Sequence, residues 1–415
     1  MTILWWKSAA DLLLAFAAIP ALCASGYLLW LTLLSRRLRP PAYGLARHRF
    51  EIVVPAHNEQ PGIADTVESL CAIDYPPGLF GVTVVADNCS DLTAARAQNA
   101  GARVFVRQDE QGRGKGYALA YAFDRIRGEG RADAVVVVDA DTVVSPNLLR
   151  AFASRLDDGA AAVQADYAVR NALESWRTRL MAVALGAFHV LRSTARERLG
   201  LSCGLRGNGM CFAASVLREV PHQAFSLVED LEYGIQLGEA GRRVHYASEA
   251  HVFGAMVTRA KAARSQRRRW EGGRWALARR HGLRLLLRAI AERNRVLFDL
   301  AVDLLVPPLS FLILFAWAGL AAAAALAVAR GSIGLSLLAW GAGALFSAAY
   351  VLRGWALSGT GARGFLDLCC APIYMIWRMA LLLKPAAHAK DEWVRTARQG
   401  EQPMDPPGPG RSSRS

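Results

Sequence analysis

Two carboxylates separated by one small residue, Asp139 and Asp141, follow the apolar run 134–138. In an extended chain, residues two apart point the same way, so both carboxylates lie on one side of the chain. Such a pair can hold a hard divalent cation, which in turn binds phosphate oxygens. The alternative is a solvated turn, because two aspartates at this spacing often occur by chance. The position after a Val-rich run favours the cation site.

A second cluster suited to phosphate lies in residues 111–116, which combine three glycines with Lys115. Backbone N–H groups at the start of a helix, together with a lysine ammonium, can bind a phosphate. The segment is not a Walker A motif, because the glycine spacing differs and no Ser or Thr follows the lysine. A flexible basic loop explains the pattern equally well.

Glu229 and Asp230 form an acidic pair that opens a predicted helix. One interpretation is a helix N-cap with a charge that favours the helix dipole. The other is that Asp230 acts as a general base, provided that it reaches an acceptor hydroxyl.

Most of the positive charge lies in residues 255–300, which hold 13 Lys/Arg against 3 Asp/Glu in a chain of net charge +14. Helices that face anionic lipid at a membrane surface account for most of these arginines. They do not account for Trp270, which follows Gln266 and three consecutive arginines. An aromatic face suits a sugar ring, and the guanidinium of Arg269 suits a diphosphate.

The candidate site residues must be positioned by a fold, and the alternation of apolar runs with helical segments predicts that fold. Continuous apolar runs alternate with segments of helical spacing, which indicates a parallel α/β sheet covered on both faces. In such sheets ligands bind beyond the carboxyl ends of the strands, where the polar clusters fall. The predicted strands are 50–56, 81–86, 104–106 and 134–138, and the predicted helices are 63–73, 92–100 and 115–127.

Uncharged runs long enough to cross a bilayer flank this region. The first, 12–34, is followed by arginines, so we expect an uncleaved anchor with its N-terminal side outside and residue 36 onward in the cytosol. Runs 304–329 and 331–352 predict a helical hairpin with a tight outer turn. A fourth run, 365–383, contains charges and Pro372 and is expected either to span or to be re-entrant.

The composition excludes several classes of protein. Apolar residues make up 53% of the 415 residues and charged residues 20%, which does not fit a disordered chain. Seven cysteines in 415 residues do not fit a disulfide scaffold, and the absence of a Cys-x-x-Cys pair argues against a zinc knuckle. The basic balance indicates an anionic partner.

From about residue 48 to 310 the chain resembles the membrane-integrated family 2 glycosyltransferases, which include cellulose synthase, hyaluronan synthase, chitin synthase and the poly-N-acetylglucosamine synthases. The matching elements occur in the family's order. They are Val53–Glu59, Asp87, Asp139-Ala140-Asp141, Val228-Glu229-Asp230 and the complete QxxRW signature Gln266–Trp270.

The resemblance implies a GT-A type domain with a Rossmann-like mixed sheet, flanked by transmembrane helices, and a nucleotide-diphosphate sugar donor, usually a UDP-sugar. Asp230 is then the base, Asp87 contacts the uracil, and Asp141 with Asp139 ligates Mg²⁺ or Mn²⁺. Trp270 and Asn208 are expected to bind the acceptor. The residues expected to hold the donor are Pro55, Glu59, Asp87, Lys115, Asp139, Gln266 and Arg269.

The expected activity is an inverting transfer of a sugar to a growing β-linked polysaccharide. Two alternatives stay open: single addition to a membrane lipid, and a catalytically silent membrane subunit. Expected partners are the donor, a saccharide or lipid acceptor, membrane lipids and other polysaccharide-synthesis proteins, but not nucleic acid. The expected location is the inner membrane, multi-pass. The expected parts are an anchor (1–47), a cytosolic GT-A domain (48–282), interfacial and transmembrane helices (283–383) and a polar tail (384–415).

Overall fold

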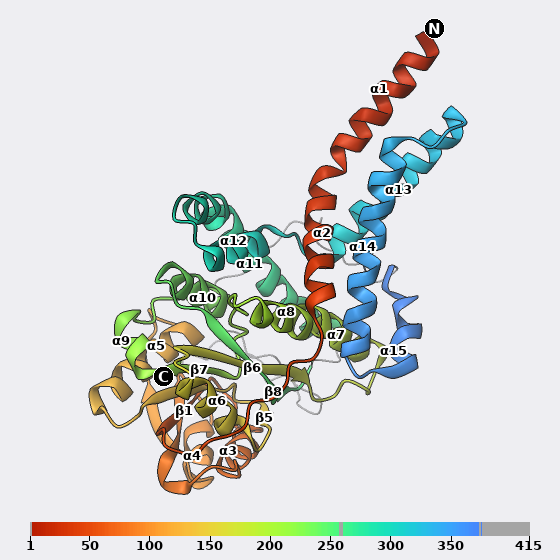
Figure 1. Cartoon of the computed structure of the whole chain (residues 1–415). Helices are drawn as coiled ribbons and strands as arrows, with labels where there is room; N and C mark the ends of the chain where they lie inside the picture. Colours follow the sequence, from red (N-terminus) through yellow and green to blue (C-terminus); the bar gives the residue numbers. More distant parts are fainter. Residues whose placement is uncertain (1, 257–259, 373–374, 376–415) are drawn as a thin grey trace, which may run out of the picture.

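The computed structural model describes the backbone of residues 2–256, 260–372 and 375, and the side chains of the same ranges apart from 2–5 and 260–271. A mixed sheet with helices on both faces forms one part of the molecule, and long apolar helices extend away from it (Figure 1).

The sheet has eight strands in the order β3-β2-β1-β4-β7-β6-β8-β5. The four strands predicted from apolar runs are present and pair in parallel, with β1 between β2 and β4. The later strands were not predicted, and three of their pairings are antiparallel. The strands are β1 (Phe50–Ala56), β2 (Phe80–Asp87), β3 (Arg103–Arg107), β4 (Ala134–Val137), β5 (Thr142–Val144), β6 (Ala162–Val169), β7 (Met210–Ala213) and β8 (Val244–Gly254).

Two apolar layers cover the faces of this sheet, because alternate residues of each strand point to opposite sides. Ile52 and Val54 of β1 pack in a layer with α3 and α6, whereas Val53 packs in the other layer with α5 and α10. The helices of this part are α3 (Ile63–Cys71), α4 (Thr93–Asn99), α5 (Lys115–Glu129), α6 (Leu148–Asp157), α7 (Trp176–Leu185), α8 (Arg192–Arg198), α9 (Ala214–Glu219) and α10 (Glu229–Glu239), with the 3-10 helix η1 (Pro77–Leu79) and the π-helix η2 (Gly186–Leu191).

The apolar runs form helices whose bounds differ from the prediction. The run 12–34 lies in α1 (Thr2–Ala17) and α2 (Ile19–Leu34), which are bent by 43° beside Pro20. The second run begins later than expected, because α12 (Arg295–Leu305) ends before Pro307-Pro308 and α13 (Leu309–Arg330) starts after them. The hairpin partner is α14 (Leu335–Leu357).

Two described helices, α13 and α14, are long and apolar enough to cross a membrane, and the bent pair α1–α2 counts as a third if it is one span. Asp11 of α1 accepts hydrogen bonds from the backbone N–H of Leu335, at 2.9 Å, and from the Ser336 hydroxyl, at 2.6 Å. It also lies 3.0 Å from the Arg330 guanidinium. The outer end of α1 and the turn of the hairpin therefore lie at the same end of the helix group (Figure 1).

Two further helices complete the described part: α11 (Ala260–Ala291), which packs on α12, and the short α15 (Gly361–Leu368). The fourth predicted run, 365–383, begins in α15, but most of it lies outside the described residues, as does the tail 384–415. Whether 365–383 spans a membrane stays a prediction, as does the division of the chain into four parts.

Candidate active site

The predicted clusters meet at one edge of the sheet. β1 and β2 run in parallel register up to Ala56 and Ala86, and β4 pairs with the other side of β1. Asp87 ends β2, Glu59 follows the end of β1, and Asp139 follows β4. The prediction that these strand ends converge is confirmed.

Pro55 and Glu59 are placed differently from the carboxylates beside them. Pro55 is buried inside β1, opposite Val85 of β2, so it shapes the strand end rather than presenting a polar group. The backbone N–H of Glu59 donates to the Thr93 hydroxyl at 2.8 Å, which fixes the turn after β1. Their expected part in donor binding stays a prediction.

Lys115 connects the strand ends to the acidic pair. As predicted, it opens a helix, α5, after Gly114 with φ +136°, a backbone conformation that favours glycine. Its Nζ donates to Asp139 Oδ1 at 2.6 Å and to the carbonyl of Gly207, and it lies 3.6 Å from Glu229 Oε1. Burial lowers the pKa of Lys115, but the Asp139 and Glu229 carboxylates outweigh burial and raise it overall. Lys115 is therefore a fixed positive charge at the centre of the cluster.

Asp230 is not the N-cap of α10. The N-cap position is Val228, which makes no side-chain cap, and Asp230 lies inside the first turn. A β-carbon added to Gly207 would lie 3.4 Å from Asp230 Oδ2 and 3.7 Å from Lys115 Nζ, so the Gly207 backbone adjoins both groups. The N-cap interpretation was wrong, and the general-base interpretation remains as a hypothesis.

Burial shifts the protonation of both members of the acidic pair. Burial raises the pKa of Asp230, and the neighbouring Lys115 ammonium offsets part of this increase. Burial also raises the pKa of Glu229 to about 7, with a further contribution from the Asp230 charge. Two adjacent carboxylates, of which Glu229 is buried and Asp230 half-buried, release their protons in coupled steps, so the pair titrates as a unit. A group with these properties can accept a proton near neutral pH.

Asn208 holds the turn that carries Asp139. Its side chain is fully buried; Oδ1 accepts the backbone N–H of Asp139 at 3.1 Å, and Nδ2 donates to the Thr142 hydroxyl at 2.8 Å. Gln164 supports it from β6 by donating to the Asn208 carbonyl at 2.7 Å. These bonds show a positioning role for Asn208, and the predicted contact with an acceptor stays a prediction.

Asp139 and Asp141 were the expected metal ligands. No group of three or more His, Cys, Asp or Glu side chains arranged for a metal occurs within the described ranges. Mg²⁺, however, is commonly bound by one or two carboxylates together with substrate phosphates and waters. Burial raises the pKa of Tyr167, and the charges of Asp139 and Asp141 raise it further. Both carboxylates therefore lie near the same tyrosine. The two carboxylates of Asp139 and Asp141 therefore fit a divalent cation that binds together with a diphosphate.

The QxxRW residues Gln266, Arg269 and Trp270 belong to the backbone of α11, but their side chains lie outside the described residues. Their predicted roles therefore stay predictions.

Sequence reasoning missed a cluster of arginines around Phe188. The ring of Phe188 lies under the guanidinium groups of Arg192, Arg206 and Arg274, at 4.7, 4.6 and 5.6 Å from its centroid. Asp303 of α12 accepts from Arg192 at 2.6 Å. Isolated arginines in a basic chain give no signal of such a cluster. Glu229, by contrast, could have been proposed from its place beside Asp230.

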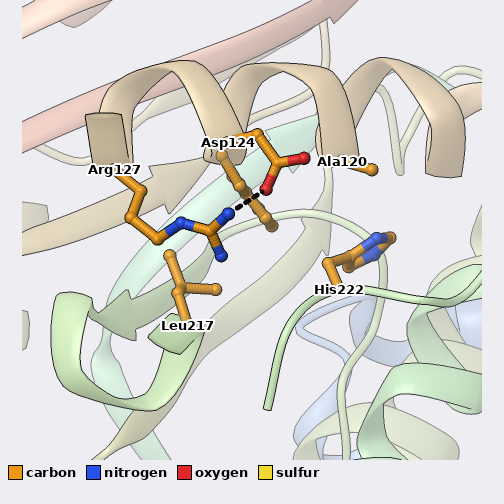
Figure 2. Close-up of a pocket in the computed structure, with 6 residues that line it drawn as sticks. Ala120, Asp124, Arg127, Leu217 and His222 are labelled. Atoms are coloured by element: carbon orange, nitrogen blue, oxygen red, sulfur yellow. Dashed lines mark hydrogen bonds and ion pairs between the residues drawn. The ribbon is translucent and has the colours of Figure 1, made fainter. Parts of the chain in front are cut away.

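A separate small hollow lies on α5, away from these groups. Figure 2 shows its lining, with the Asp124 and Arg127 side chains joined by an ion pair of 2.8 Å. None of the predicted site residues lines it. Its lining residues are Ala120, Phe123, Asp124, Arg127, Leu217 and His222.

Residues 48–273, more than half of the chain, match the family model described as glycosyltransferase-like family 2. The chain is 24% identical over 264 residues to the probable glycosyltransferase YdaM of Bacillus subtilis, covering 61% of this chain. It is 32% identical over 235 residues to a beta-monoglucosyldiacylglycerol synthase of Synechocystis, covering 54% of this chain. The chain spans 60% and 47% of the lengths of these two relatives.

Among solved structures, mannosyltransferase PcManGT of Pyrobaculum calidifontis, in complex with GDP-Man and Mn²⁺, matches with a TM-score of 0.51 at 19% identity. The match covers 84% of this chain and 97% of that one. This likeness shows the shared GT-A type fold.

Proposed function

The chain belongs to glycosyltransferase-like family 2, and from that membership we propose that it is an inverting enzyme that transfers a sugar from a UDP-sugar to a growing β-linked polysaccharide. The observation that carries the proposal is the convergence of Asp139, Lys115 and the acidic pair Glu229-Asp230 at one edge of the sheet. This edge is where ligands bind in open α/β sheets.

In the proposed reaction, Asp230 accepts the proton of an acceptor hydroxyl as that oxygen attacks the anomeric carbon. Direct displacement inverts the anomeric centre, so an α-linked donor gives a β-linkage. Asp141 and Asp139 hold Mg²⁺ or Mn²⁺, which supplies charge neutralisation for the departing diphosphate. Lys115 keeps Asp139 and Glu229 in place around the same point and adds a fixed positive charge.

Donor binding is assigned to Asp87 for the base and to Pro55, Glu59 and Lys115 near the diphosphate. Gln266 and Arg269 complete the diphosphate site, and Trp270 with Asn208 contacts the acceptor. An aromatic ring suits a sugar face, and a guanidinium suits a diphosphate, which is the reason for placing the QxxRW residues there.

The complete QxxRW signature favours a polysaccharide acceptor. A second candidate acceptor is a membrane lipid, which is favoured by the 32% identity to a protein named as a beta-monoglucosyldiacylglycerol synthase. Both acceptors are compatible with a membrane-bound enzyme. From the apolar helices we infer a multi-pass protein of the inner membrane whose sheet domain faces the cytosol. Membrane lipids and other polysaccharide-synthesis proteins are the further partners that we propose.

The test is release of UDP by the purified full-length protein, reconstituted in lipid nanodiscs and offered a panel of UDP-sugars with Mg²⁺ or Mn²⁺. The product is then separated as polymer or glycolipid, and its anomeric configuration is determined by NMR. A β-linked polymer supports the first candidate, and a glycolipid supports the second. An α-linked product from an α-linked donor would refute the inverting mechanism, and no release of UDP from any UDP-sugar of the panel would refute the proposal as a whole.

A further inference from the structure

A closed set of hydrogen bonds surrounds the end of β2. Arg107 of β3 donates to Asp87 Oδ1 at 2.6 Å and to Asp109 Oδ2 at 2.7 Å. The backbone N–H of Asp109 donates to Asn88 Oδ1 at 2.9 Å, and the backbone N–H of Asn88 donates to the Arg107 carbonyl at 2.8 Å. Asp87 and Asn88 are thus both fastened to the same short segment, 107–109.

Within the described part of the chain, one polar atom of each of these two side chains is buried without a hydrogen-bond partner. They are Asp87 Oδ2, on a residue that is 0% exposed, and Asn88 Nδ2. Buried polar atoms are nearly always hydrogen-bonded, so two on consecutive residues require an explanation. A ligand that supplies both partners is one.

The chemical identity of the two atoms is fixed by the bonds around them. Asn88 Oδ1 is the atom that accepts the Asp109 N–H, so Nδ2 is the free end of the amide and can only donate. An ionised Asp87 carboxylate only accepts. The backbone of Asn88 also has a positive φ of 50°, which Asn tolerates and which holds the side chain against the segment 107–109.

We propose that Asn88 is a specificity-determining residue for the donor's base, reading it together with Asp87. Asp87 Oδ2 accepts a ring N–H, and Asn88 Nδ2 donates to the ring carbonyl next to it. Uracil and guanine present this N–H beside a C=O. Cytosine and adenine present the reverse pattern, a ring nitrogen acceptor beside an amino donor. They are rejected because their ring nitrogen would face the acceptor Asp87 Oδ2 and their amino group would face the donor Asn88 Nδ2.

The inference rests on the proposed function for the place of the nucleotide, and it adds Asn88 as a residue that selects the base. The experiment measures binding alone, so that it does not depend on sugar transfer. Full-length protein in nanodiscs is titrated calorimetrically with UDP, GDP, CDP and ADP in the presence of Mn²⁺. We expect UDP or GDP to bind at least about 10-fold more tightly than CDP and ADP.

The variant Asn88→Asp removes the donor and keeps the oxygen that accepts the Asp109 N–H. We expect it to weaken UDP binding by at least about 10-fold. The matched control is Asn58→Asp at the end of β1. Asn58 has the same left-handed backbone, with φ 55°, and its Oδ1 accepts the Ser90 N–H at 2.8 Å. Asn58 Nδ2 is not among the buried unpartnered atoms, so this control adds the same charge without removing a reading group.

A ligand-side test needs no variant. UDP methylated at the base N3 cannot donate to Asp87, and we expect it to bind at least about 10-fold more weakly than UDP. If UDP and its N3-methyl derivative bind equally, or if both Asn variants bind UDP equally well, the base-reading inference is refuted while the glycosyltransferase proposal stands. Tighter binding of CDP or ADP likewise refutes it. If the native protein binds no nucleoside diphosphate, the proposed function fails together with it.

Discussion

Replacing Asp230 by Asn tests the proposed base directly, because Asn keeps the shape of the side chain but cannot accept the proton. The side chain lies in the first turn of α10 beside Lys115 and Gly207, and not at the N-cap. We expect turnover to fall by about 10²–10⁴-fold, the usual cost of losing a general base. This corresponds to about 2.7–5.4 kcal/mol in the activation free energy.

Donor binding is expected to survive the substitution. In the proposed site the nucleotide rests on Asp87, the diphosphate on Arg269 and the cation on Asp141, none of which changes. The charge of Asp230 also interacts favourably with the helix dipole, which is worth about 0.3–1 kcal/mol, and with the Lys115 ammonium, whereas burial disfavours the charge. Stability is therefore expected to change by at most about 1 kcal/mol, far less than the barrier.

The pH dependence gives a second signature. The base must be deprotonated, and burial raises the pKa of Asp230, so kcat/KM of the native enzyme should decline with falling pH at a higher pH than an ordinary aspartate would give. In Asp230→Asn the charge that helps to raise the pKa of Glu229 is gone. The midpoint of the residual activity should then move to lower pH.

The assay measures UDP-sugar binding and turnover on the same preparation of Asp230→Asn. The matched control is Glu232→Gln, which neutralises another carboxylate of the same turn. Glu232 accepts the backbone N–H of Ser226 at 3.0 Å and lies outside the Lys115 cluster. Near-native turnover of Asp230→Asn, or an equal loss in both variants, would refute the assignment of Asp230 as the base.

Three further predictions follow from the site and its surroundings. Activity should vanish with EDTA and return with Mg²⁺ or Mn²⁺, and Asp141→Asn should weaken metal-dependent donor binding; full turnover in chelator would contradict the metal assignment. Trp270→Ala should mainly impair acceptor use, seen as a raised acceptor KM with an unchanged donor Kd, because it removes a stacking face and no charge. Asp303→Asn should lower the free energy of unfolding by about 3–5 kcal/mol, because it leaves the buried Arg192, at 2.6 Å from the carboxylate, without a counter-ion and leaves Arg196 paired with Asp299 alone. An unchanged thermal midpoint would contradict that estimate.

The first half of the sheet could be predicted because its signals are local. Strands β1, β2 and β4 are continuous apolar runs, each ending at a polar cluster, and parallel strands bring those ends to one edge. The second half could not. β5 has 3 residues and β7 has 4, and their antiparallel pairings join segments far apart in the sequence. No alternation long enough to detect exists in strands of that length. β6 and β8 are longer, but polar residues interrupt their apolar runs.

The site was predictable where one segment carries its own chemistry. Asp139, Asp141 and Asp230 were proposed from spacing and context, whereas the pairing of Lys115 with Asp139 required the fold. The two interpretations of Asp230 could not be separated by composition, because an acidic residue near a helix start suits both. Only the position of Val228 as the N-cap decided against one of them.

The arginine cluster shows why the apolar helices and the site cannot be treated as independent. Arg192 and Arg196 of α8 bind Asp303 of α12, and they also reach Tyr350 of α14 and Tyr27 of α2 through hydrogen bonds of 2.7 and 2.6 Å. These are buried ionic contacts, whose geometry must be kept because an unpaired buried charge is costly. The Phe188 ring contacts the guanidinium groups of both Arg192 and Arg206. Arg206 precedes Gly207, whose backbone adjoins Asp230. A change in how the apolar helices pack is therefore expected to reach the acidic pair through this ring, and loss of Asp303 should reduce turnover as well as stability.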